Sequence, residues 1–454
     1  MLSRGRVLIA PAYLFACLIL GGSAQGIWQN MVLQLAGIAI IAWAALDRSE
    51  ERFPPPARQL LLLAVGAVAV IAAQLIPLPP SIWAQAGPRA DIAKDFTSLG
   101  LAVPWQPLSV APAAGLDALF KIIPALAIVC AMVRLRAYLP RWLAVAIFAG
   151  TLAGIALGAM QIASTGAEVS PLYLYEDTSV GKAVGFFANA DHMATLLVIA
   201  LPFLAATLAA ARSANMQRYS AVLAVVAGLA VLILIGLAMN GSLAAFTLVL
   251  PVLAGSALIV LPPGNRSRSW LLIVVLLLLA ASVAALEKTA IGSGRMGTHA
   301  TTAAQSRAEL LLTTSRAASD FLPWGSGLGS FQSVYPLYES PLTVDATYVV
   351  HAHNDYAEMV LELGVAGIVL MALFLVWWAA AVWRTWRTAE AGPFARAATI
   401  ASAAILVHSV VDFPLRTAAI SACFGMCLAL LADSRAAPRK EKTDLRRKRH
   451  VEFK

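Results

Sequence analysis

Two histidines, an amide and two carboxylates lie close together where a polar segment of the chain meets an apolar one. They are His351, His353, Asn354, Asp355 and Glu358. Asp355 and Glu358 have the spacing of a helix capping box, which predicts a helix beginning here with His353 just before its positive N-terminal end. Such a dipole disfavours imidazolium, so a neutral His353 could take a proton from an attacking hydroxyl. The alternative interpretation is that both histidines only cap the helix or bridge loop carbonyls.

The apolar segment that follows contains Glu362, Gly364 and Gly367. The two glycines are expected to allow close packing of neighbouring helices and to have no direct chemical role. Glu362 lies a few residues into the segment. It is a candidate substrate contact or the buried partner of another polar group.

A second polar pair, His408 and Asp412, lies near the end of another apolar segment. Their spacing of four places both on one side of a helix, close to its outer boundary. Polar groups at membrane depth are costly when unpaired. We therefore expect a structural hydrogen-bonded pair beside the histidine motif rather than a second catalytic centre.

The composition of the whole chain is that of a membrane protein. Of its 454 residues, 60% are hydrophobic and 13% are charged, and the mean hydropathy is +0.78. Water-soluble globular proteins are apolar in about half of their residues, so most of this chain must have lipid as its solvent. All 4 cysteines fall inside apolar runs and are expected to be small core residues without disulfides.

Apolar windows predict an all-α integral membrane protein, a polytopic bundle of about twelve transmembrane helices. Residues 1–286 are expected to hold helices 1–9, and residues 357–432 helices 10–12. Residues 287–356 form a large loop between helices 9 and 10, and a basic tail occupies 433–454. The predicted spans are 7–25, 27–46, 59–77, 116–133, 141–162, 190–211, 218–238, 242–262, 269–286, 357–383, 395–411 and 413–432.

Basic residues give the orientation, because cytoplasmic loops retain Lys and Arg. Every second predicted loop is basic, as at Arg58 and Arg141, so both termini are expected in the cytoplasm. The net charge of +9 favours anionic membrane lipids as partners and not nucleic acid, since no recognition motif is present. The first apolar run follows Arg4 and Arg6 as in a signal peptide, but it leads straight into the next run. It is therefore expected to be an uncleaved span.

The opposite, outer side then carries three long segments, 78–115, 163–189 and 287–356. In the last of them, apolar residues recur at helical spacing on one face from 304 to 321. This pattern predicts an amphipathic helix lying at the membrane surface. Pro323 and the glycine-rich stretch from Gly325 to Ser330 are expected to end it in a turn.

Four stretches of the C-terminal part resemble the O-antigen ligase and polymerase superfamily of bacterial membrane glycosyltransferases. HNDYAEMVLELGVAG (His353–Gly367) is similar to its signature of a histidine, an amide or hydroxyl residue, nine residues, a glycine, two residues and a second glycine. The other stretches are GFFANADHMATLLVIALP, with an Asn-x-x-His entry to a span, PWGSGLGSFQSVYP, and HSVVDFPLR from His408. Together the four stretches cover roughly the C-terminal 270 residues, with the ligase-related region at about 185–370. The resemblance implies a GT-C-like fold. Ile368 stands where the family usually has Gly, Thr or Tyr, which fits a distant branch.

The resemblance implies a set of site residues. His353 would be the catalytic base, and Arg307, at the start of the outer helix, would engage the diphosphate of a lipid-linked donor. From sequence alone, Arg307 could equally be an interfacial arginine that reaches toward headgroups. The expected substrate-binding residues are His351, Asn354, Asp355, Glu358, Asn189, His192 and Arg295.

A second arginine of the family, normally at the outer end of a middle span, is missing. The corresponding stretch reads NGSLAA from Asn240. Asn240 and Ser242 could supply neutral donors, Arg295 or Lys182 could supply the charge from another loop, or the donor could be held differently. No metal and no other cofactor is expected, since the first outer loop lacks the acidic motif of metal-dependent relatives.

By this resemblance the chain would transfer a glycan from undecaprenyl diphosphate to an acceptor hydroxyl, with inversion, on the periplasmic face of the bacterial inner membrane. The acceptor would be lipid A-core for a ligase, or a growing glycan for an O-antigen or exopolysaccharide polymerase. A transporter or flippase is the alternative of another class, because about twelve spans is also a common transporter count. Against it, the polar residues crowd one side of the membrane and no internal repeat is detectable.

Overall fold

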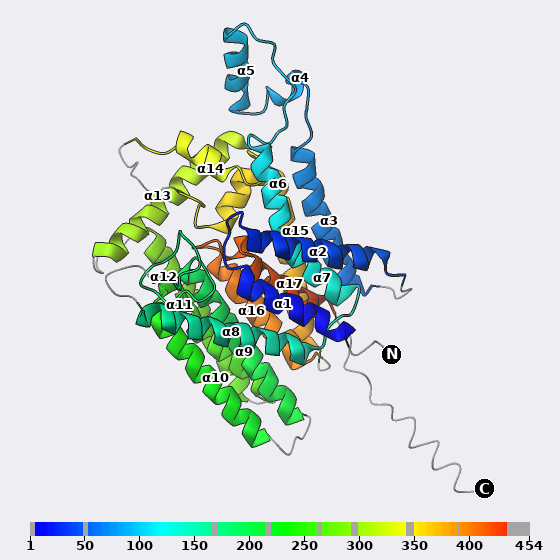
Figure 1. Cartoon of the computed structure of the whole chain (residues 1–454), viewed down its shortest axis with the longest axis vertical. Helices are drawn as coiled ribbons and strands as arrows, with labels where there is room; N and C mark the ends of the chain where they lie inside the picture. Colours follow the sequence, from blue (N-terminus) through cyan, green and yellow to red (C-terminus); the bar gives the residue numbers. More distant parts are fainter. Residues whose placement is uncertain are drawn as a thin grey trace, which may run out of the picture.

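The computed structural model describes residues 5–48, 53–164, 170–213, 219–261, 266–291, 298–341, 349–388 and 391–433. Helices dominate these ranges (Figure 1). The main helices are α1 (Ile9–Leu20), α2 (Trp28–Leu46), α3 (Pro55–Gln74), α4 (Pro80–Trp83), α5 (Arg89–Ser98), α6 (Pro112–Lys121), α7 (Ile123–Val133), α8 (Pro140–Ala163), α9 (Ala190–Ser213), α10 (Tyr219–Asn240), α11 (Leu243–Val260), α12 (Arg266–Ile291), α13 (Thr298–Phe321), α14 (Phe331–Val334), α15 (Asp355–Arg387), α16 (Pro393–His408) and α17 (Ala418–Ala432). Short 3₁₀ turns are η1 (Arg6–Leu8), η2 (Tyr335–Leu337) and η3 (Pro414–Arg416).

Each apolar segment predicted to cross the membrane falls on a helix, or in one case on the adjoining pair α6 and α7. Within the described ranges, 8 helices are long and apolar enough to cross, with that pair counted as one. The remaining apolar helices are shorter, namely Arg6–Leu20, Ile273–Ser282, Pro393–His408 and Ala418–Ala432. The chain is thus a polytopic, all-helical membrane protein in its described parts. The count of about twelve spans stays a prediction.

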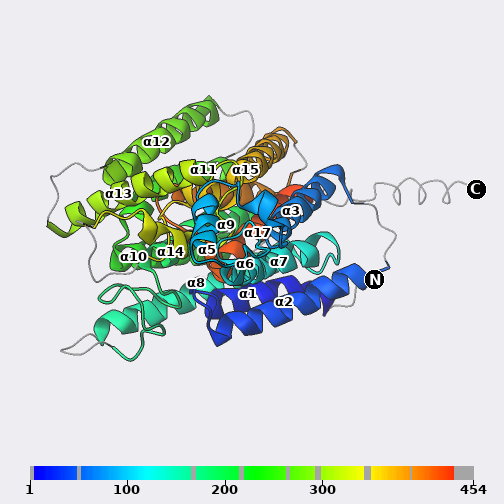
Figure 2. The same cartoon turned by 90° about the horizontal axis from the view of Figure 1, so that it is seen from above.

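Helix α9 is the central helix of the bundle. Its apolar stretch is 72% buried, against 22% for α3 and for α10. It contacts α8, α10, α11 and α16, while α12 lies on one outer side of the bundle and α1 and α2 on the other (Figure 2). Because lipid is as apolar as a helix surface, outer helices need little burial.

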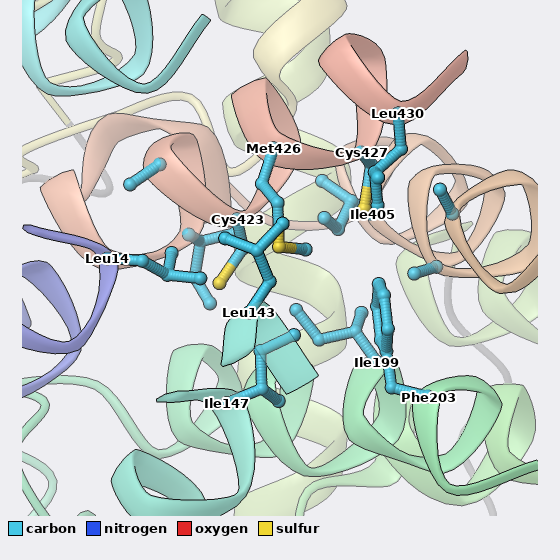
Figure 3. Packing of buried hydrophobic residues seen from close by; sticks show 14 of the residues in the cluster. Leu14, Leu143, Ile147, Ile199, Phe203, Ile405, Cys423, Met426, Cys427 and Leu430 are labelled. Carbon is cyan, nitrogen blue, oxygen red and sulfur yellow. The ribbon is translucent and has the colours of Figure 1, made fainter. Parts of the chain in front are cut away.

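The main apolar core joins helices from the beginning, middle and end of the chain. Side chains that are 0% exposed meet there (Figure 3): Leu14, Leu143, Ile147, Ile199, Phe203, Ile405 and Met426. Cys17, Cys423 and Cys427 are buried in the same cluster, whereas Cys130, at intermediate exposure, packs against a separate small cluster that includes Leu135. All are free thiols, as the sequence predicted.

One end of the bundle gathers segments that the sequence predicted to be cytoplasmic. The guanidinium of Arg6 lies 3.4 Å from the carboxylate of Asp47 at the end of α2. Arg134, after α7, donates to the backbone carbonyl of Asp47, and the hydroxyl of Tyr138 donates to Asp433 after α17. These four segments therefore meet at one end of the bundle, in agreement with the charge pattern. Which side of the membrane this end faces stays a prediction.

The opposite end carries the long connecting segments, with α4 and α5 at its tip (Figure 1). Arg89 of α5 is buried and donates to the carbonyls of Ala86 (3.0 Å), Gly325 (2.7 Å) and Leu108. Helix α13 ends at Phe321 and is followed by turns, as predicted. The hydrogen bonds of Arg89 therefore link the segment 78–111 to the glycine-rich turn that follows α13.

Gly364 interrupts the helical backbone of α15, with φ of 59° and ψ of −142°. The turn after α13 pairs with the backbone beside this break: Gly327 N–H donates to the carbonyl of Glu362 (2.9 Å), and Val365 N–H donates to that of Pro323 (2.9 Å). A Cβ on Gly364 would lie 2.2 Å from the Pro323 oxygen. Close packing was the expected role of Gly364, but here it is the turn after α13, and not only a neighbouring helix, that packs against it. The positive φ also requires a residue without a side chain.

We expect Gly364→Ala to destabilise the protein by about 1–3 kcal/mol, because alanine is strained at this φ and clashes with the turn. Thermal unfolding of the detergent-purified protein measures the change. Gly228→Ala in α10 is the matched control, since a Cβ there meets nothing within 4 Å. Equal melting temperatures of the two variants would contradict the requirement for glycine.

Candidate active site

Helix α15 begins at Asp355, but its cap is one residue earlier than the sequence indicated. The Oδ1 of Asn354 accepts hydrogen bonds from the backbone N–H groups of Tyr356 and Ala357, both at 3.0 Å. The predicted capping box of Asp355 with Glu358 is thus wrong, although the helix start is right. Glu358 instead accepts from the N–H of Ala352 at 2.9 Å. Because the Glu358 carboxylate already accepts from the loop before the helix, it is not available to cap the N-terminus of α15.

His353 directly precedes the cap and has a positive φ of 49°. Few residues other than glycine adopt this conformation, and it is often found at functional sites. The Nδ1 of His353 lies 3.1 Å from the Oδ1 of Asp412, and the His353 side chain is 31% exposed. A carboxylate on Nδ1 fixes the tautomer and leaves Nε2 as the nitrogen that can meet a substrate.

Asp412 is the centre of a buried imidazole cluster. The Nε2 of His192, on α9, lies 3.4 Å from the Oδ2 of Asp412. Phe413 packs against the rings of His192, His351 and His353, with centroid distances of 5.0, 4.5 and 4.9 Å. Burial alone would raise the pKa of Asp412, but the neighbouring histidines hold it below its ordinary range. Asp412 is therefore an anion at neutral pH.

The predicted pair of His408 and Asp412 is wrong. The Nδ1 of His408 lies 2.7 Å from the hydroxyl of Thr195 on α9. Only the backbone joins the two residues, through the N–H of Asp412 and the carbonyl of His408 at 3.1 Å. Helix α16 ends at His408, so Asp412 leaves the helical register that would have stacked it over the imidazole.

His351 is held by Glu358, with 2.8 Å between Nδ1 and Oε1. Burial lowers the pKa of His351, and the carboxylate of Glu358 only partly offsets this effect. Its side chain is 12% exposed. His351 is therefore less accessible than His353, and its contact with Glu358 holds the loop that carries both residues.

Arg416, in η3, is a site residue that the sequence reasoning missed. Its guanidinium lies 3.4 Å from Asp355, 3.2 Å from Glu358 and 3.4 Å from Glu362. The carboxylates of Glu358 and Glu362 are 1% and 0% exposed. Glu362 is thus a buried pair partner, one of the two predicted options. The sequence did contain a signal for such a residue. Asp355, Glu358 and Glu362 share one face of a helix, and buried carboxylates require a cation opposite them.

Arg307, on α13, faces the entry of α9. Its Nη2 lies 3.4 Å from the Oδ2 of Asp191, the residue before His192. The side chains of Arg307 and Asp191 are 29% and 20% exposed, so this ion pair is accessible to water. The structure therefore places Arg307 next to the histidine cluster along α9, and among the described residues its guanidinium pairs with Asp191 alone.

The remaining predicted residues have other roles or lie elsewhere. Asn189 accepts from the N–H of Asp191 at 2.8 Å and so orders the start of α9. The amide of Asn240 donates to the carbonyls of Ala183 and Ala190, both at 2.8 Å, and Ser242 caps α11. These contacts hold the backbone, so the side chains of Asn240 and Ser242 have structural roles. Arg295 lies outside the described residues.

Together these contacts form an accessible imidazole backed by a carboxylate, with a partly free guanidinium nearby. An imidazole so held can act as a general base toward a hydroxyl. A guanidinium can stabilise charge that develops on a phosphate leaving group. The arrangement is therefore chemically suited to transfer of a group from a phosphate to an alcohol.

Residues 197–372 match the O-antigen ligase family. The matched region runs from α9 into the second half of α15 and contains Arg307, His351 and His353. His192, Asp412 and Arg416 lie outside it. A comparison with curated proteins found no match.

Proposed function

We propose, from the premise that this chain belongs to the O-antigen ligase family, that it transfers a glycan from undecaprenyl diphosphate to an acceptor hydroxyl. The reaction takes place on the periplasmic side of the bacterial inner membrane, with both chain termini in the cytoplasm. One observation carries this proposal: the Nδ1 of His353 lies 3.1 Å from the carboxylate of Asp412, while the His353 side chain is 31% exposed and so accessible to a substrate.

In this mechanism His353 is the general base. Its Nε2 takes the proton of the acceptor hydroxyl while that oxygen forms a bond to the anomeric carbon. The Asp412 carboxylate on Nδ1 stabilises the imidazolium that results. The proton then passes to water, because the side chain is partly exposed.

Arg307 acts on the leaving group. As the bond between the anomeric carbon and the diphosphate breaks, its electron pair stays on the diphosphate oxygen, and the guanidinium stabilises that charge. Direct displacement inverts the anomeric configuration. The proposed reaction uses no metal and no other cofactor. His192 and His351 position the base, and Asn354 holds the helix end behind it.

A ligase and a polymerase share this chemistry and differ in the acceptor. We favour the ligase assignment, with lipid A-core as acceptor, and a growing glycan is the acceptor of the polymerase alternative. Deleting the protein and separating the surface glycans by electrophoresis distinguishes them. A ligase deletion loses all attached polymer and accumulates lipid-linked polymer, whereas a polymerase deletion gives single-repeat products. An unchanged glycan pattern would contradict both.

We expect Arg307→Gln to reduce transfer by about 10- to 100-fold, because glutamine cannot supply a charge-assisted contact to the diphosphate. A reconstituted assay with a lipid-diphosphate donor measures kcat and KM. Arg316→Gln is the matched control, since Arg316 is an exposed arginine of the same helix. Equal activity of the two variants would rule Arg307 out of the mechanism.

A further inference from the structure

The first turn of α9 makes two charged contacts with different parts of the proposed site. The carboxylate of Asp191 lies 3.4 Å from the guanidinium of Arg307 on α13. The next residue, His192, has its Nε2 3.4 Å from the carboxylate of Asp412, which also contacts His353. Since an α-helix has about 3.6 residues per turn, adjacent side chains point about 100° apart. One helical turn therefore contacts both the proposed leaving-group cation and the carboxylate of the base.

Side chains from three positions fix the backbone of this turn. The Oδ1 of Asn189 accepts from the N–H of Asp191 at 2.8 Å. The amide of Asn240, at the end of α10, donates to the carbonyl of Ala190 at 2.8 Å. The hydroxyl of Thr195 donates to the carbonyl of Asp191 at 2.9 Å, and both Thr195 and Asn240 are buried. The carboxylate of Asp191 therefore projects from a backbone that is held in place.

Arg307 needs a fixed partner of this kind. An arginine side chain has many rotamers, and that of Arg307 is 29% exposed. Among the described residues, Asp191 is the partner of its guanidinium. A guanidinium carries five N–H donors in a planar fork, so one contact with a carboxylate leaves other donors for a second anion. Asp191 can therefore orient Arg307 without occupying it.

The geometry of this ion pair favours orientation over two other roles. A role in stability is disfavoured because both side chains are accessible to water, and such pairs contribute little to the free energy of unfolding. A role in blocking the site would be served best by a bidentate contact with both edges of the fork. The contact found here runs from Nη2 to Oδ2 alone, at 3.4 Å.

We propose that Asp191 is a positioning residue, whose carboxylate aims the Arg307 guanidinium at the donor diphosphate. Because His192 of the same turn contacts the carboxylate of the base, the turn also sets the spacing between this cation and His353. The inference rests on the proposed function and adds the residue that orients its leaving-group cation. Asp191 itself contacts no reacting atom in this scheme.

Asp191→Asn tests the proposal, since asparagine keeps the size of the side chain and removes its charge. We expect kcat/KM for the donor to fall about tenfold, as for a displaced catalytic group, while the acceptor KM stays unchanged. Asp191→Glu keeps the charge and should recover part of the loss. Asp91→Asn is the matched control, because it removes an exposed carboxylate that pairs with Lys94 on α5.

A double variant shows whether Asp191 acts through Arg307. If it does, Arg307→Gln/Asp191→Asn should be no slower than Arg307→Gln alone. Additive losses would give Asp191 a role of its own and overturn the proposal. So would a loss of activity that is matched by a lower melting temperature, or a failure of Asp191→Glu to exceed Asp191→Asn.

A binding measurement separates this inference from the proposed function, because it needs no turnover. Inorganic pyrophosphate is titrated into the detergent-purified protein, and its dissociation constant is measured from the rise in melting temperature. We expect weaker binding by Asp191→Asn than by Asp91→Asn. Tighter binding would show that Asp191 competes with the anion, and equal binding would show that it does not orient Arg307.

The unsubstituted protein supplies the remaining comparison. If it binds pyrophosphate with this dependence on Asp191 but transfers no glycan, the proposed function fails and the positioning of Arg307 stands. If it does not bind pyrophosphate, there is no anion site at Arg307 and the inference fails.

Discussion

Replacement of His353 by glutamine is expected to reduce glycan transfer by about 10²- to 10⁴-fold, the usual contribution of a positioned general base. Glutamine keeps a polar side chain of similar length but cannot accept the proton of the acceptor hydroxyl. The donor KM should change little, because in the proposed mechanism Arg307, and not His353, contacts the donor. Steady-state kinetics of the reconstituted protein separate the two constants.

The role of Asp412 provides the control for this prediction. If Asp412 acts only by holding His353, the double variant His353→Gln/Asp412→Asn should be no slower than His353→Gln alone. Melting temperatures of both variants exclude unfolding as the cause. Transfer at the unsubstituted rate by His353→Gln would remove this residue from the mechanism.

Arg416→Met is expected to destabilise the protein by about 3–5 kcal/mol, the usual result of removing one partner from a buried ion pair. Methionine fills much of the volume, but it leaves the carboxylates of Glu358 and Glu362 buried without their cation. Asp355 loses its partner as well. Unfolding in detergent, followed by size-exclusion fluorescence during heating, measures the loss.

Two further variants test the cause of this instability. Glu362→Gln in the Arg416→Met background removes one unpaired charge and should recover part of the melting temperature. Arg384→Met, at the other end of α15, removes an arginine that, among the described residues, donates to the Ala380 carbonyl, and it should have little effect. Equal melting temperatures for Arg416→Met and Arg384→Met would show that the carboxylates need no cation.

The amino-acid sequence alone was sufficient to predict the membrane class, the apolar helices and the family. The hydrophobic segments follow from local composition, because a helix in lipid satisfies its own backbone hydrogen bonds. The start of α15 beside His353 and the end of α13 at Phe321 were also predicted from local residue patterns. The N-cap of α15 was misassigned by one residue, because asparagine and aspartate, here Asn354 and Asp355, are both favoured at the N-cap position.

Only the tertiary structure decided which polar groups meet. His353 finds Asp412 at a distance of 59 residues along the chain, and Arg416 reaches Glu362 across 54. Spacing within one helix cannot predict such pairs, because they depend on how α15, α16 and the η3 turn pack. The motif around His353 thus indicated a base, while packing supplied its carboxylate and the buried arginine that neutralises the acidic face of α15.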